Sequence, residues 1–208
     1  MKKALIIGLF AVVGILNTSC EDEEICLAIH LADLVLEKLS IAVPTVQVGV
    51  AFKISTIVKN IAKGTNFCET KSAPESDTEY TAEYRADANS PWESIEIENQ
   101  SGQSVMAVYA PVGKVSAGST SGYESSFMME TPGFYRFLGK ADGRLAVEER
   151  NENNNLNTSN GGSLNRSAEA VNAEYVVIEV LPSEDDTDDI EKEKKNARVY
   201  YLGSQKLW

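Results

Sequence analysis

The side chains that could carry chemistry in this 208-residue chain are three cysteines, one histidine and 31 acidic residues. A nucleophilic triad of the Ser–His–acid or Cys–His kind would have to be built on His30, the single histidine. Zinc sites draw on several cysteine and histidine ligands, and the sequence has too few for one. Carboxylate pairs such as Glu148 and Glu149 are common in so acidic a chain and do not by themselves indicate glycoside hydrolysis. We therefore predict no enzyme, no cofactor and no metal centre, with His30 as a packed or surface residue.

The charge balance excludes one large class of partners. Nineteen Lys and Arg against 31 Asp and Glu give a formal net charge of −12 and a pI of about 4.6. Binding to phosphate backbones or to an anionic membrane surface needs clustered basic side chains. The basic cluster at 192–195 is interleaved with glutamates. Nucleic acid is therefore excluded as a partner, and a membrane is expected to be contacted only through an anchor.

The first residues follow the order of a secretory signal. Two lysines precede an unbroken apolar run, Ala4–Leu16, and a small polar stretch then leads to Cys20. The run has 13 residues, fewer than the roughly 17–25 that a spanning helix needs. This arrangement resembles a bacterial lipoprotein signal, in which residues 1–19 are removed and Cys20 carries the lipid. The leucine usually found three positions before that cysteine is replaced by Asn17.

The segment after Cys20 bears on where such an anchor lies. The acidic run Glu21–Glu24 resembles the export tag of surface lipoproteins in the Bacteroidota. The resemblance implies an outer-membrane lipoprotein at the cell surface, whereas without the tag the periplasmic face of that membrane is expected. Two alternatives stay open, namely that the four acids are only a solvated tether, or that the protein is secreted after cleavage at a nearby site. Residues 20–31 form a tether and lead-in in either case.

Beyond the lead-in, apolar and polar residues alternate with the period of half-buried β-strands. The longest pattern places six residues on one face: Val48, Val50, Phe52, Ile54, Thr56 and Val58. Shorter strand patterns, separated by turn-forming clusters, occur from about Asp33 and at 78–86, 95–98, 104–110, 124–130, 134–141 and 172–181. Several short strands without βαβ alternation predict an all-β sandwich over 32–182. The charged block after Pro182 predicts that 183–208 is a disordered or loosely helical tail.

Two distant stretches resemble the CARDB family, the cell-adhesion-related domains of bacteria. The matching residues are Asp33, Leu34, Val58, Lys59, Asn60 and Gly64 in the first stretch, and Tyr135, Asp142, Val147, Glu149, Asn151, Glu152, Asn153 and Asn154 in the second. The resemblance covers 32–182 and implies an immunoglobulin-like or fibronectin type III-like sandwich. The segments 63–77 and 156–170 are longer than the family usually carries between these strands.

The second stretch allows two interpretations. Asn and Asp side chains hydrogen-bond their own backbone in turns, so the cluster is first of all a folding device. The alternative is a calcium or ligand site on Asp142, Glu149 and Glu152, because hard cations take carboxylate and amide oxygens.

The two other cysteines suggest a disulfide. With Cys20 lipidated, Cys26 and Cys68 remain in an oxidising compartment, where disulfides form and persist. They flank two predicted strands, one starting near Asp33 and one ending near Ala62. If these strands are antiparallel neighbours, a bridge closes a loop of about 43 residues. Two buried free thiols are the alternative.

The leading functional hypothesis is a non-enzymatic binding or adhesion module that presents loops or a sheet edge to a protein or glycan. A stacking platform for a sugar or peptide is one way to bind, with core packing as the commoner role of its four candidate residues, Trp92, Tyr109, Tyr123 and Phe134. Two alternatives are a structural accessory subunit of an outer-membrane complex and, more remotely, a hydrolase. The oligomeric state is left open.

Overall fold

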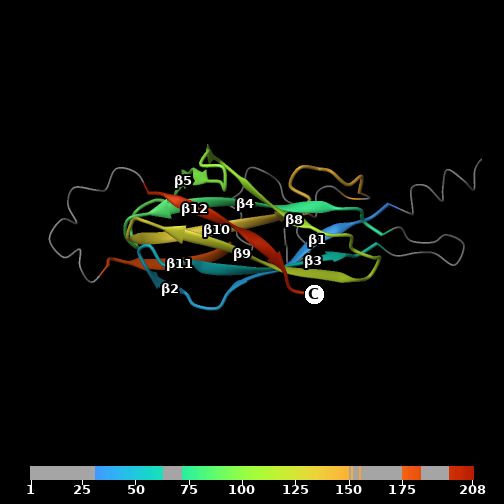
Figure 1. Cartoon of the computed structure of the whole chain (residues 1–208), viewed down its shortest axis with the longest axis horizontal. Helices are drawn as coiled ribbons and strands as arrows, with labels where there is room; N and C mark the ends of the chain where they lie inside the picture. The colour runs from blue at the N-terminus through green and yellow to red at the C-terminus, as the bar shows by residue number, and fades with distance from the viewer. Residues whose placement is uncertain (1–30, 63–71, 150, 152–154, 156–174, 184–196) are drawn as a thin grey trace, which may run out of the picture.

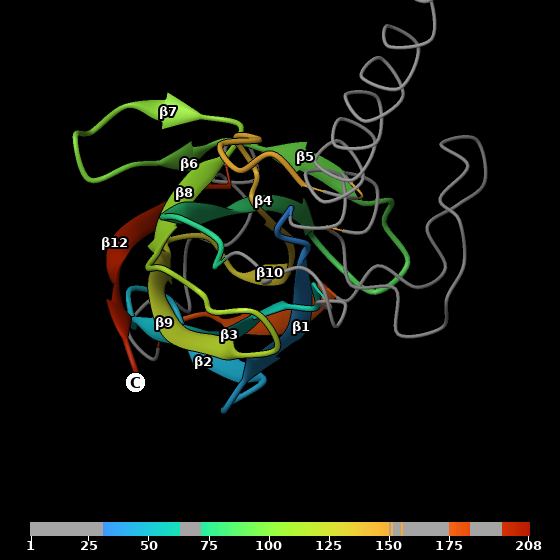
Figure 2. The same cartoon turned by 90° about the vertical axis from the view of Figure 1, so that its right-hand side faces the viewer.

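The structure is a computed structural model, and it describes residues 31–62, 72–149, 151, 155, 175–183 and 197–208. These residues form twelve strands in two sheets that face one another (Figures 1 and 2). The predicted all-β sandwich is therefore confirmed. In this described part of the chain, no helix is long and apolar enough to cross a membrane.

The first sheet is antiparallel except at one pair of strands. Its order is β1 (Leu34–Ile41), β3 (Phe52–Asn60), β9 (Thr120–Met129), β12 (Val199–Lys206), β6 (Ile97–Glu98) and β7 (Ser104–Val105). Strands β12 and β6 run parallel, and the other neighbours run antiparallel. Figure 1 shows β12 in red, running along the length of the sandwich to the C-terminus.

The second sheet is built around the long pair β10 and β4. Its order is β2 (Thr45–Gln47), β11 (Tyr175–Leu181), β10 (Gly133–Ala141), β4 (Ser76–Arg85) and β5 (Glu93–Ile95). A further strand, β8 (Val108–Val112), pairs with the first half of β4, while β5 pairs with its second half. Strands β2 and β11 run parallel, and the other pairs are antiparallel.

The core lies between the two sheets and is centred on Phe127 of β9. Its ring centroid lies 4.9 Å from that of Phe137, 5.4 Å from Tyr201, 5.5 Å from Tyr80 and 6.0 Å from Phe52. The predicted inward face of β3 is confirmed, because Phe52, Ile54, Thr56 and Val58 are all buried. Aromatic pairs in such tilted arrangements add about 0.5–1.5 kcal/mol each beyond the burial of their surface.

The same alternating pattern was predicted to include Val48 and Val50, and for Val50 this is wrong. Strand β3 begins at Phe52, and the Val50 side chain is 46% exposed. The chain changes sheets just before β3, since Val48 N donates to Leu181 O of β11 while Gly49 N donates to Met129 O of β9. Gly49 makes the turn at φ +75°, a conformation that favours glycine. The alternation continues through Val50 in the sequence. Because the chain changes sheets at this point, Val50 does not share the buried face of Phe52 and Ile54.

A second change of sheet divides the pattern predicted at 95–98. Ile95 pairs with Ala82 in the second sheet, whereas Ile97 pairs with Val105 and Val199 in the first. One predicted strand is thus two short strands, β5 and β6, one in each sheet. The pattern at 104–110 divides in the same way into β7 and β8.

The tail predicted over 183–208 needs a correction at its end. Residues 184–196 lie outside the described residues, but 199–206 form β12 in the middle of the first sheet. Val199 and Tyr201 are buried, at 1% and 7% exposure. The sandwich therefore does not end at 182. Its last strand, β12, follows the charged block that was expected to lie beyond the domain.

Candidate functional site

The first family-like stretch forms a junction between strand ends. Asn60, buried at the end of β3, accepts hydrogen bonds at Oδ1 from the backbone N–H of Asp33 (3.2 Å) and of Ala62 (3.1 Å). Its Nδ2 donates to Val115 O at 3.1 Å, so one amide joins three segments. These contacts stabilise backbone groups that would otherwise be buried without partners. Asn60 therefore acts in folding.

In the second family-like stretch, too, buried polar side chains hydrogen-bond to backbone groups. Asp142 is buried at φ +45°, and its carboxylate accepts from the backbone N–H of Ala146 at Oδ1 and of Val147 at Oδ2, both at 3.0 Å. Glu149, also buried, accepts at Oε1 from Leu34 N at 3.0 Å. These bonds support the interpretation as a folding device. Glu152 lies outside the described residues, among which no group of three His, Cys, Asp or Glu could hold a metal ion.

The cysteine and histidine predictions fall where the structure describes nothing. Cys20, Cys26, His30 and Cys68 all lie outside the described residues. The condition on which the disulfide prediction rests is met, because β1 and β3 are antiparallel neighbours. The start of β1 and the end of β3 meet where Ile61 N donates to Asp33 O at 2.7 Å. The disulfide itself stays a prediction.

Tyr123 is a core residue, which is the commoner of the two roles expected for the four aromatic candidates. Its side chain is 2% exposed and its hydroxyl donates to Thr78 in the core. Beside it, Tyr80 Oη and Thr56 Oγ1 are 2.5 Å apart, and Ser125 Oγ donates to Tyr80 Oη at 3.3 Å. Burial raises the pKa of Tyr80 to about 12 and raises that of Tyr123 well above its ordinary value. The cluster is a set of buried neutral hydroxyls.

Two other candidates, Trp92 and Phe134, gather on the outer face of the second sheet, together with Tyr175 and two arginines. We name this group the arginine–aromatic row, and it consists of Arg85, Trp92, Phe134, Arg136 and Tyr175. Arg85 Cζ lies 4.5 Å from the Trp92 ring centroid and 5.2 Å from that of Phe134. Arg136 Cζ lies 4.7 Å from the centroid of Trp92 and 5.5 Å from that of Tyr175. The guanidinium groups and rings thus alternate across the sheet.

Four neighbouring segments place these side chains. Arg85 ends β4, Trp92 directly precedes β5, Phe134 and Arg136 occupy outward positions of β10, and Tyr175 begins β11. Tyr175 is 47% exposed, and the other four members are half-buried. Arg136 forms an ion pair with Glu83, and Arg85 Nη1 donates to Ala88 O at 2.9 Å. The row is accordingly held in place while its outer side stays in contact with solvent.

Sequence reasoning named two of the five members of this group as candidates. Trp92 and Phe134 were candidates for a platform, with core packing as the commoner expectation, whereas Arg85, Arg136 and Tyr175 were missed. Tyr109 was a further candidate, but it lies opposite the first half of β4, where Arg144 Cζ is 4.1 Å from its ring centroid. The sequence signal that could have identified the two arginines is their position on the outward face of predicted strands in an acidic chain.

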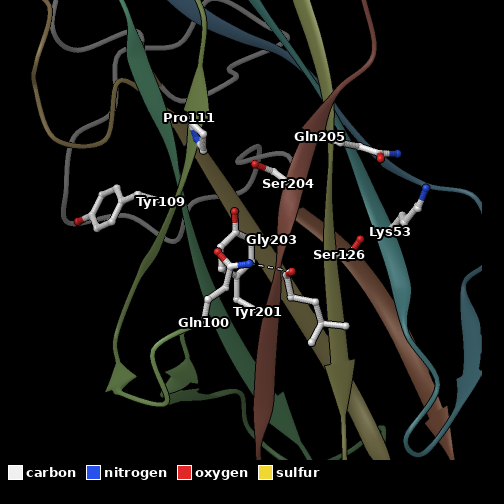
Figure 3. Close-up of a pocket in the computed structure, with 10 residues that line it drawn as sticks. Lys53, Gln100, Tyr109, Pro111, Ser126, Tyr201, Gly203, Ser204 and Gln205 are labelled. Atoms are coloured by element: carbon white, nitrogen blue, oxygen red, sulfur yellow. Dashed lines mark hydrogen bonds between the residues drawn. The ribbon is translucent and has the colours of Figure 1, made fainter.

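A groove on another side of the sandwich follows the last strand (Figure 3). Its volume is about 360 Å³, and it extends across β12, from Tyr109 and Pro111 of β8 on one side to Ser126 of β9 and Lys53 of β3 on the other. It is lined by Lys53, Gln100, Tyr109, Pro111, Ser126, Tyr201, Leu202, Gly203, Ser204 and Gln205. Gln100 Nε2 donates to Leu202 O at 3.0 Å, and Lys53 Nζ pairs with Glu124 Oε2 at 2.8 Å. The register of β12 against β9 shifts between Tyr201 and Gly203, so Leu202 is an inserted bulge residue.

Comparison with known proteins adds evidence on the fold. No family model matches the chain, and no curated protein matches it. Among solved structures, the chain is similar to a CARDB domain from Pyrococcus furiosus, whose crystal structure is described as a complex with di-metal ions. The TM-score is 0.41 and the identity 14%, over 73% of this chain and 90% of that one. At this similarity no residue role or ligand is transferred to this chain.

Proposed function

We propose that this chain is a non-enzymatic lipoprotein of the cell envelope whose sandwich binds a protein partner. The observation that carries the proposal is the arginine–aromatic row. Residues that dominate protein–protein binding are enriched in Trp, Tyr and Arg, and they cluster on well-packed surface patches. Two guanidinium groups and three rings across neighbouring strands form such a patch. The patch lies on the outer face of antiparallel strands, a face that ordinarily carries polar side chains.

The geometry of the row favours a protein over a glycan. A sugar stacks on the open face of an aromatic ring, but Trp92 already has two guanidinium groups within 4.7 Å of its ring centroid. Phe134 and Tyr175 each have one. A partner protein is recognised by the whole patch, through the outer edges of the rings and the remaining N–H groups of the arginines. A stacking platform for a glycan is therefore the second candidate.

The proposed location rests on the N-terminal sequence. A basic start, a 13-residue apolar run and Cys20 support a lipid anchor, and Glu21–Glu24 support display at the cell surface. Stable anchoring requires more than one acyl chain, which a lipoprotein cysteine provides. Cys20→Ala should move the protein from the membrane to the soluble fraction. Persistent membrane fractionation of this variant would refute the anchor.

The binding proposal is tested by co-purification after crosslinking in intact cells, with the full-length chain and two matched variants. Trp92→Ala removes the central ring of the row, while Trp208→Ala removes a tryptophan that is 60% exposed and packs over Gly122 on the other sheet. Truncation of a central interface residue typically costs about 2 kcal/mol or more, or roughly a 30-fold loss of affinity. The captured protein should be lost with Trp92→Ala and retained with Trp208→Ala.

A glycan array with the same variants separates the two candidates. Glycan binding that Trp92→Ala abolishes would replace the protein partner with a carbohydrate. Capture of the same proteins by both variants would show that the row is not the binding surface.

A further inference from the structure

The edge of β12 that lines the groove is paired over only part of its length. On one side, β9 pairs with β12 from Val199 to Lys206. On the other side, β6 pairs with Val199 and Tyr200 alone. Within the described residues, no strand pairs with 201–206 on this second side. The part of the groove lined by Gln100, Tyr109 and Pro111 lies next to that edge (Figure 3).

The hydrogen-bond pattern shows which backbone groups face the groove. Leu207 N donates to Gly122 O at 2.9 Å, so these two residues form a hydrogen-bonded pair of the antiparallel ladder. Bonded and non-bonded pairs alternate in such ladders. Gly203 and Gln205 therefore direct their backbone groups to β9. The N–H and C=O groups of Ser204 and Lys206 point the other way, to the open edge.

One acceptor on this edge is already occupied by a side chain. Gln100, exposed just after β6, donates from Nε2 to Leu202 O at 3.0 Å, as a strand N–H would do. Gly203, at φ +113°, permits this approach, because a Cβ at that position would lie 2.7 Å from Gln100 Nε2. The exposed side chain of Gln100 thus occupies the first hydrogen-bonding position that a strand added beside β12 would use.

The charges near the groove indicate the chemistry of its occupant. Lys53 is compensated by Glu124 at 2.8 Å. Lys206 reaches toward β8, with Nζ 3.9 Å from the position that a Cβ at Gly113 would occupy. Among the described residues no carboxylate forms an ion pair with Lys206. In a chain of net charge −12, the far end of this edge therefore offers an uncompensated cation.

We propose that the groove binds an extended peptide segment of a partner protein, which adds to the first sheet as a strand beside β12. Main-chain hydrogen bonds to Leu202, Ser204 and Lys206 provide affinity, and an acidic side chain of the peptide pairs with Lys206. The edge from Leu202 to Lys206 is about 13 Å long, which accommodates roughly five residues. This site is separate from the arginine–aromatic row and does not depend on it.

The test uses the full-length protein and fluorescein-labelled hexapeptides of alternating Val and Thr with one Glu, scanned through all six positions. Binding is measured by fluorescence anisotropy. Each binding peptide is then made in two further forms, N-methylated on the odd or on the even residues. An added strand donates to β12 from alternate residues only, so one methylated form should lose at least tenfold in affinity while the other retains binding.

Three protein variants complete the test. Lys206→Gln should weaken the Glu peptides several-fold and leave their Gln counterparts unchanged. Gln100→Ala, which removes the competing side chain, should not weaken binding. Trp92→Ala should leave peptide affinity as it is, so that failure of the row and failure of the groove are distinguished. Absence of binding by every Glu peptide at millimolar concentration, equal binding of both methylated forms, or loss of binding in Trp92→Ala would overturn the proposal.

Discussion

Replacement of Tyr201 by alanine tests whether residues 197–208 belong to the folded sandwich. The Tyr201 ring is 7% exposed and its centroid lies 5.4 Å from that of Phe127, at the centre of the core. Truncation of a buried aromatic side chain to alanine costs about 3–5 kcal/mol. The neighbouring Leu202 side chain is 45% exposed, so Leu202→Ala should change the free energy of unfolding by no more than about 0.5 kcal/mol.

The measurement is urea denaturation of the soluble chain from residue 21, with thermal unfolding as a second readout. For a domain of this size, each kcal/mol corresponds to about 2–4 °C in Tm, so Tyr201→Ala should lower Tm by roughly 6–20 °C. Tyr201→Phe keeps the ring and should retain most of the stability. If Tyr201→Ala and Leu202→Ala have equally small effects, the last twelve residues are a tail, and the assignment of β12 is refuted.

Ile54→Ala should cost about 2–5 kcal/mol in urea unfolding because the side chain is fully buried, while Lys53→Ala on the outer face should cost less than about 1 kcal/mol; equal costs would contradict the assigned faces. Burial in the folded state raises the pKa of Tyr80 from 10.0 to about 12, so the folded protein retains a proton on Tyr80 that the unfolded chain loses. The contribution of this pKa shift to the free energy of unfolding is complete below pH 10 and is lost as the pH rises from 10 to 12. Stability should fall by about 1.4 kcal/mol at pH 11 from this residue alone, and a Tyr80→Phe variant with an unchanged pH dependence would argue against this origin. Thiol titration of unreduced, unfolded protein should detect neither Cys26 nor Cys68, and two reactive thiols would exclude the disulfide.

The sequence predicts the inward face of β3 well because that strand stays in one sheet and its neighbours bury alternate residues. Phe52 and Ile54 are core residues for this reason. The prediction fails at Val50, where the chain has just moved from one sheet to the other at Gly49. Alternation reports which residues share a face, but not where the chain changes sheets, and those changes depend on the positions of distant strands.

Strand β12 escaped prediction for a different reason. Its apolar residues, Val199 and Tyr201, follow a charged block in which no core pattern exists. The burial of both depends on β9, which lies about 70 residues earlier in the chain. A short apolar run of this kind can be assigned as a strand only when the sheet edge with which it pairs is known.

The candidate binding surface shows the same limit. Trp92 and Phe134 are recognisable as aromatic residues near turns, but their contact with Arg85 and Arg136 depends on the register between strands. In that register Phe134 lies opposite Arg85, and Arg136 lies opposite Glu83. Because no local pattern encodes this pairing, Trp92 and Phe134 could be named as candidates from the sequence, whereas Arg85, Arg136 and Tyr175 could not.

The position of β12 near the end of the chain also bears on when the first sheet can be completed. Gln100 and Leu202, which meet beside β12, are 102 residues apart in the chain. Contacts of such long sequence separation form slowly, because a large loop must close before the contact is gained. A nascent chain that lacks β12 leaves one side of β9 unpaired. The first sheet is therefore complete only once the last strand of the chain is available to pair with β9, an order that suits the export of an unfolded chain under the proposed leader.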